Sequence, residues 1–156
     1  IFFNKNKHEY YQLVFNLMMG MTVFLIVSYV YPNAQHLRPT EFPRDNIFTD
    51  MVKWLYSTDT PTNILPSIHV FNSLAIHMSL TNCEALRDKK IVTAASFTLT
   101  ALIIMSTMFL KQHSVIDVCM GATLALFGFL VFYPRKAAVS SRASYFGEAR
   151  RKKSEN

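Results

Sequence analysis

Long uncharged runs alternate with polar segments along this chain. Three of the apolar runs, 10–31, 91–110 and 114–133, are about as long as a membrane-spanning helix of roughly 20 residues. A fourth run, 66–80, is shorter and would cover only about 22 Å as a helix. The pattern predicts an all-α, polytopic membrane bundle with four spanning helices.

A polar segment, residues 33–65, separates the first two apolar runs. Asp45 or Asn46 could cap a short helix within it. One face of that helix would be apolar, with residues at helical spacing: Ile47, Met51, Trp54 and Leu55. Because Trp suits the level of the lipid headgroups, we expect this helix to lie on the membrane surface.

Composition agrees with a single membrane domain and a basic end. The chain has 156 residues, 51% of them hydrophobic, and a formal net charge of +6. Much of this charge lies in the Ser-rich tail, 135–156. Beside a membrane span such a tail more often marks the cytoplasmic side than a nucleic-acid partner. We therefore expect a transmembrane domain at 1–134, a cytoplasmic tail at 135–156 and no nucleic-acid binding.

Lysine and arginine residues also orient the helices. If four helices alternate in direction, Lys5, Lys7, the loop 87–90 and the tail share one side. That side should be cytoplasmic, which leaves the loop 33–65 outside. The expected location is a plasma membrane of bacterial type. The chain begins at Ile1 without a signal-peptide pattern, so we expect that preceding helices are missing.

The extracytoplasmic end of the predicted bundle would carry two histidines and a carboxylate. His113 and Asp117 are four residues apart, so they share one face of a helix. A carboxylate there can hold one ring nitrogen as N–H and leave the other free to react. His69 lies at the start of another apolar run, where it could protonate a leaving oxygen. These residue types are suited to a nucleophile, its supporting carboxylate and a general acid.

Three further residues at this end could bind phosphate. Arg38 offers a bidentate fork for phosphate oxygens, and Lys111 offers a point charge. Ser67 opens a helix whose free N–H groups and dipole favour an anion. The set fits phosphoryl transfer without a metal, and we expect no cofactor.

These residues also form stretches that resemble known signature motifs. In order and spacing, Arg38-Pro39, Pro66-Ser67-Ile68-His69 and His113-Ser114-Val115-Ile116-Asp117 resemble the three motifs of the type 2 phosphatidic acid phosphatase (PAP2) superfamily. This superfamily includes lipid phosphatases, prenyl pyrophosphate phosphatases, inositol phosphorylceramide synthase-like transferases and vanadium haloperoxidases. The resemblance covers roughly residues 31–121.

The resemblance implies a six-helix membrane fold with an outward-facing site. By it, His113 becomes phosphohistidine, Asp117 supports His113, and His69 is the general acid. Arg38 and the backbone around Ser67 would hold the phosphate.

Two positions depart from the family pattern. Tyr31 stands where a Lys is usual seven residues before Arg38, and Thr107 stands where an Arg is usual six residues before His113. Lys111 could replace one of these cations. The sequence of residues 106–113 resembles most the corresponding stretch of inositolphosphotransferase-like members. A weaker set of cations suits a less charged phosphodiester, a transfer reaction or reduced activity.

The preferred function is therefore a membrane phosphatase or phosphotransferase that acts on lipid phosphate or pyrophosphate esters. Water or a lipid hydroxyl could accept the phosphoryl group. Two alternatives belong to other classes of protein. One is a non-catalytic membrane module with a degenerate phosphate site. The other is a zinc site, although its candidate ligands are not closely spaced: His36, His69, His113 and Asp117.

Overall fold

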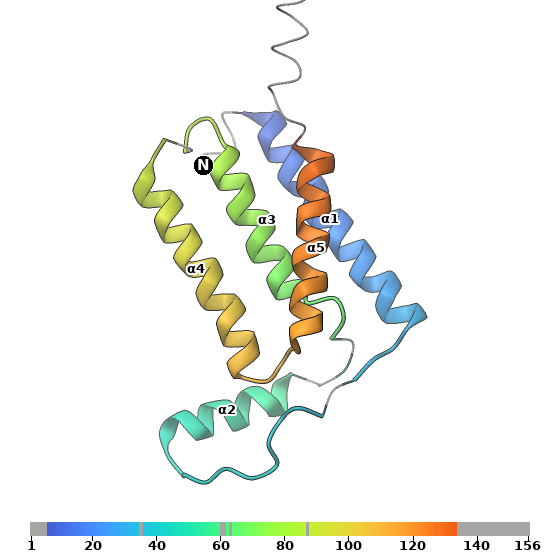
Figure 1. Ribbon diagram of the computed structural model, residues 1–156, viewed down its shortest axis with the longest axis vertical. Helices are drawn as coiled ribbons and strands as arrows, with labels where there is room; N and C mark the ends of the chain where they lie inside the picture. The colour runs from blue at the N-terminus through green and yellow to red at the C-terminus, as the bar shows by residue number, and fades with distance from the viewer. Residues whose placement is uncertain (1–5, 35, 60–61, 63, 87, 134–156) are drawn as a thin grey trace, which may run out of the picture.

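The computed structural model describes residues 6–34, 36–59, 62, 64–86 and 88–133. Within these ranges the chain forms five helices and no strand (Figure 1), so the all-α prediction is confirmed. Each predicted helix is present with its ends within about one turn of the apolar run. The basic tail lies outside the described residues. The helices are α1 (Lys7–Val30), α2 (Ile47–Thr58), α3 (Ile68–Asn82), α4 (Lys90–Phe109) and α5 (Val115–Phe132).

Three of these helices are long and apolar enough to cross a membrane, namely α1, α4 and α5. With 15 residues, α3 covers only about 22 Å of a hydrocarbon core of about 30 Å. The predicted set of four spanning helices is therefore not confirmed. Three residues of α3 are fully buried, namely Val70, Phe71 and Ala75. α3 is the short central helix around which the long ones pack.

The helices alternate in direction around α3, which packs against α1, α4 and α5. α1 also packs against α5, whereas α4 makes an extensive contact with α3 alone. The end with Lys7, Lys89 and Lys90 lies opposite the end with α2, which runs across the bundle (Figure 1). The polar loop and the loop before α5 therefore meet at the same end of the bundle.

The short helix predicted in the polar segment is present as α2. Asn46 is its N-cap, and the Asn46 side chain accepts a hydrogen bond from the Thr49 amide at 2.9 Å. The apolar residues on its outer face are strongly exposed, with Ile47 at 71% and Trp54 at 69%. An amphipathic helix at the ends of spanning helices suits the boundary between lipid and water.

Two glycines allow close helix contacts. A Cβ at Gly20 of α1 would lie 2.0 Å from the ring of Phe71 in α3. A Cβ at Gly121 of α5 would lie 2.6 Å from the carbonyl oxygen of Ser67, the residue that caps α3. The second contact lets the start of α3 lie close to the second turn of α5.

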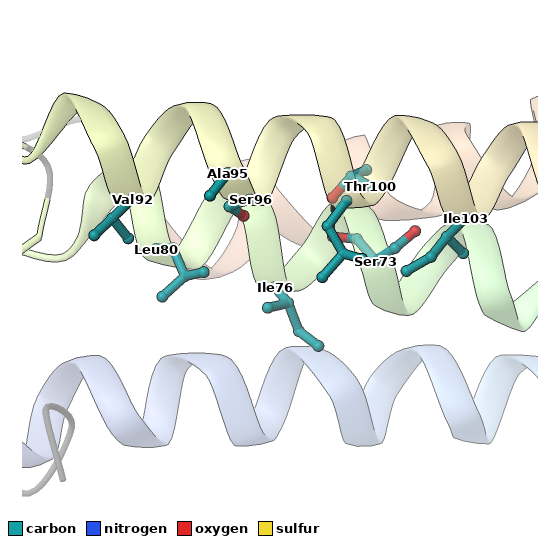
Figure 2. A pocket seen from close by; sticks show the side chains of 9 residues that line it. Ser73, Ile76, Leu80, Val92, Ala95, Ser96, Thr100 and Ile103 are labelled. Carbon is teal, nitrogen blue, oxygen red and sulfur yellow. Dashed lines mark hydrogen bonds between the residues drawn. The ribbon is translucent and has the colours of Figure 1, made fainter.

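A groove of about 330 Å³ runs between α3 and α4 (Figure 2). Its polar groups are largely engaged, since the Thr100 hydroxyl donates to the Ser73 carbonyl at 3.3 Å and Ser96 lies 3.1 Å from a ring nitrogen of His77. The remaining lining is apolar: Ile76, Leu80, Val92, Ala95, Leu99 and Ile103.

Candidate active site

The two candidate catalytic histidines meet at the end of the bundle that carries α2. His69 lies in the first turn of α3, and His113 precedes Ser114, the N-cap of α5. The ring centroids are 5.8 Å apart, and the rings are inclined at 58°. The fold therefore brings together the histidines of two separate motifs.

Asp117 fixes the geometry of the start of α5. The Ser114 amide donates to the Asp117 carboxylate at 2.7 Å, and the Asp117 amide donates to the Ser114 hydroxyl at 3.4 Å. This reciprocal pair is a capping box. The Ser67 amide donates to the Asp117 carbonyl at 3.2 Å, which ties α5 to the start of α3. Asp117 therefore forms hydrogen bonds at the start of α5 and at the start of α3.

The Asp117 carboxylate also faces His113. Its Oδ2 lies 3.8 Å from His113 Nδ1, and the two side chains are only 4% and 9% exposed. This distance is longer than a hydrogen bond. Among the described residues, Nδ1 has no hydrogen-bond partner and is shielded from solvent. The carboxylate therefore lies beside the ring without a hydrogen bond to it.

The surroundings of His113 favour its neutral form. Burial lowers the pKa of His113 below its ordinary value of 6.5, and the nearby His69 lowers it further. Asp117, Asp59 and the backbone of Ile64 act in the opposite direction without outweighing these effects. At neutral pH the ring is therefore uncharged, as a nucleophile requires.

Arg38 precedes α2 in the sequence, but its side chain packs against the C-terminal end of that helix. Its guanidinium donates to the Tyr56 carbonyl at 3.2 Å and lies 4.7 Å from the centre of the Tyr56 ring. It also donates to the carbonyl of Asp59 and, at 2.9 Å, to the Asp59 carboxylate. The Arg38 side chain is only 13% exposed. The predicted phosphate ligand is therefore held in place by its own loop.

The end of α2 is bonded in turn to the loop that carries His113. The Tyr56 hydroxyl donates to the Leu110 carbonyl at 2.7 Å. The Gln112 side chain donates to the Asp59 carboxylate at 3.1 Å. The motifs did not indicate Tyr56, Asp59 or Gln112, because in the sequence they are ordinary loop and helix residues.

The other two predicted phosphate ligands differ in their surroundings. Ser67 is fully buried, and its hydroxyl accepts from the Val70 amide at 3.4 Å, which makes it the N-cap of α3. Lys111 is exposed and has a positive φ of 49°. The chain turns there, and the amides of Gln112 and His113 both donate to the Thr107 carbonyl. A phosphate-binding role for Ser67 or Lys111 stays a prediction.

Within the described ranges, no group of three or more His, Cys, Asp or Glu residues is arranged to hold a metal ion. The zinc alternative therefore gains no support from the described geometry.

Comparison with known proteins supports membership of the PAP2 superfamily. The family model of the PAP2 superfamily matches residues 34–139, about two thirds of the chain. The match is to the superfamily as a whole and does not support the narrower resemblance to inositolphosphotransferase-like members. No curated protein and no solved structure matches the chain.

Proposed function

The chain belongs to the PAP2 superfamily, and on this basis we propose that it is an integral membrane phosphatase or phosphotransferase for lipid phosphate or pyrophosphate esters. The observation that carries this proposal is the pair of rings of His69 and His113, 5.8 Å apart, with Asp117 behind one of them. This geometry supports the proposal that His113 is the nucleophile, Asp117 its supporting carboxylate and His69 the proton donor.

In the first half of the proposed reaction, Nε2 of His113 attacks phosphorus and forms an N–P bond. The ester P–O bond breaks, and His69 gives its proton to the departing oxygen. Asp117 then faces the positive charge that develops on the His113 ring. Arg38 would bind phosphate oxygens with its guanidinium in exchange for some of its present partners at Tyr56 and Asp59.

In the second half, an acceptor hydroxyl attacks the phosphorus of phosphohistidine. His69 takes the proton from the acceptor, the N–P bond breaks, and His113 returns to its neutral state. Water as acceptor makes the protein a phosphatase, and a lipid hydroxyl makes it a phosphotransferase. The chemistry of His69 is the same in both cases, because each acceptor loses one proton.

Orientation and location are part of the same proposal. Lys7, Lys89 and Lys90 share the end opposite the site, which by the positive-inside rule would be cytoplasmic. The site and α2 would then face the extracytoplasmic side of a plasma membrane, of bacterial type, and the tail would be cytoplasmic. Phosphate release from phosphatidate and a prenyl pyrophosphate, in detergent with a chelator present, tests the proposed activity.

The groove between α3 and α4 could accommodate an alkyl chain of the substrate (Figure 2). Ser73 lies four residues after His69 on α3, so the groove begins about 6 Å along the helix from the histidine. A lipid bound there would place its phosphate near the helix ends. Ala95, which is exposed and lines the groove, is a suitable position at which to test this.

Ala95→Phe is expected to raise the KM for a long-chain lipid substrate about tenfold. The new ring would fill part of the groove and exclude about two methylene groups of the chain, which would then lose their packing contacts with α3 and α4. Activity towards a water-soluble short-chain ester should stay the same. Leu102→Phe, at an exposed α4 residue outside the groove, serves as the control. Equal changes in both variants would argue against a chain-binding groove.

The acid limb of the pH–rate profile is expected below pH 6.5. His113 reacts only when neutral, and its lowered pKa keeps it neutral further into the acid range. Asp117→Asn removes a charge that raises this pKa, so the limb should move to still lower pH. The profile of kcat/KM should be measured with a phosphodiester, whose own charge is constant in this range. A limb above pH 6.5 would contradict the assignment of His113.

A further inference from the structure

The carboxylate of Asp59 occupies a place on Arg38 that a phosphate oxygen would also favour. Arg38 Nη2 donates to Asp59 Oδ2 at 2.9 Å, and Nη1 donates to the Asp59 and Tyr56 carbonyls. Both terminal nitrogens of the guanidinium therefore already have acceptors. The Asp59 side chain is 47% exposed, so it lies at the open side of this contact.

The same carboxylate also reaches the loop of the nucleophile. Asp59 Oδ2 accepts a second hydrogen bond, at 3.1 Å, from the side chain of Gln112, the residue before His113. The negative charge of Asp59 also raises the pKa of His113, against the larger effect of burial, which lowers it. The carboxylate thus links Arg38 to Gln112, the residue before His113.

This arrangement leaves little positive charge at the site. Arg38 and Asp59 form an ion pair and cancel, and Asp117 adds a negative charge beside His113. The remaining cations among the predicted site residues are the exposed side chain of Lys111 and, in the first half of the proposed reaction, the protonated ring of His69. A phosphomonoester carries a charge of about −1.5 to −2 at pH 7, whereas a phosphodiester carries a single negative charge. Repulsion by a fixed carboxylate is in proportion to the charge of the ligand.

We propose that Asp59 is a specificity-determining residue that favours phosphodiesters, with one negative charge, over phosphomonoesters, with two. The inference rests on the proposed function and names the substrate class of the same site. A diester reaction at His113 transfers a substituted phosphoryl group, and the alcohol of the broken ester bond leaves with the proton of His69.

The test measures how the full-length protein in detergent binds inorganic phosphate and dimethyl phosphate at about pH 8.5, where inorganic phosphate is doubly charged. The wild type should bind dimethyl phosphate more tightly. Asp59→Asn keeps an oxygen acceptor for Arg38 and Gln112 but removes the charge. It should tighten inorganic phosphate binding about tenfold and dimethyl phosphate binding about threefold, since the electrostatic free energy scales with ligand charge.

Asp50→Asn is the matched control, because it removes the same charge from the exposed first turn of α2. It should leave the ratio of the two affinities unchanged. Equal effects of Asp59→Asn on both ions, weaker binding of both, or a wild type that binds neither would each overturn the inference. The proposed function is judged separately, by whether turnover of any phosphate ester depends on His113.

Discussion

His113→Ala is expected to lower turnover of every phosphate ester substrate by at least about a thousandfold. The variant lacks the nitrogen that is proposed to attack phosphorus, and the methyl group of alanine cannot act as a nucleophile. The measurement follows release of p-nitrophenol from bis(p-nitrophenyl) phosphate and of phosphate from phosphatidate, with EDTA present. Because the chelator removes free divalent metal, activity of the wild type would agree with metal-independent chemistry.

His8→Ala is the control for this experiment. His8 is exposed on the first turn of α1, at the end of the bundle opposite the site. Its replacement should leave activity unchanged. The wild type should also form a phosphorylated protein that loses its label in acid, as a phosphoramidate does, and His113→Ala should not. Turnover that survives in His113→Ala would exclude phosphohistidine at this residue.

Gly121→Ala is expected to lower activity about tenfold or more and the free energy of unfolding by about 1–3 kcal/mol. The added Cβ would lie 2.6 Å from the Ser67 carbonyl oxygen. Backbone atoms cannot rotate out of the way as a side chain can, so α5 must move relative to α3. Such a movement would change the 5.8 Å spacing of His69 and His113. Activity and thermal unfolding in detergent are the two measurements.

Gly128→Ala provides the matched control, with the same substitution at the far end of the same helix. Its Cβ would meet the side chain of Asn16 of α1, at 2.1 Å from the amide oxygen. This variant should lose stability but keep the activity of the folded fraction. If both variants lose stability and activity in parallel, the contact of Gly121 has no special role in aligning the site.

Much of the helical fold is predictable because a membrane helix requires a long apolar run. The runs at 10–31, 91–110 and 114–133 coincide with α1, α4 and α5 within about one turn. The N-cap of α2 was predictable to within one residue, because Asp45 and Asn46 both have side chains suited to the first free amides; the structure uses Asn46. The central role of α3 was not, because its burial depends on three partners and not on its own sequence.

The candidate site was predictable for the residues that belong to sequence motifs. It was not predictable for the residues that come into contact only in the folded chain. His69, His113 and Asp117 converge because the starts of α3 and α5 lie side by side. The Asp59 carboxylate reaches Arg38 and Gln112 only through the path of the loop and α2. Sequence spacing carries no signal for such a contact between distant residues.

The position of the two histidines along the bundle determines how a lipid substrate would reach them. His69 and His113 lie at the helix ends, on the side crossed by the amphipathic helix α2. A lipid headgroup could therefore react while its alkyl chains remain in the bilayer. The protein would avoid the cost of extraction, about 0.8 kcal/mol for each methylene group. The rate would then follow the mole fraction of substrate in the bilayer and not its concentration in bulk water.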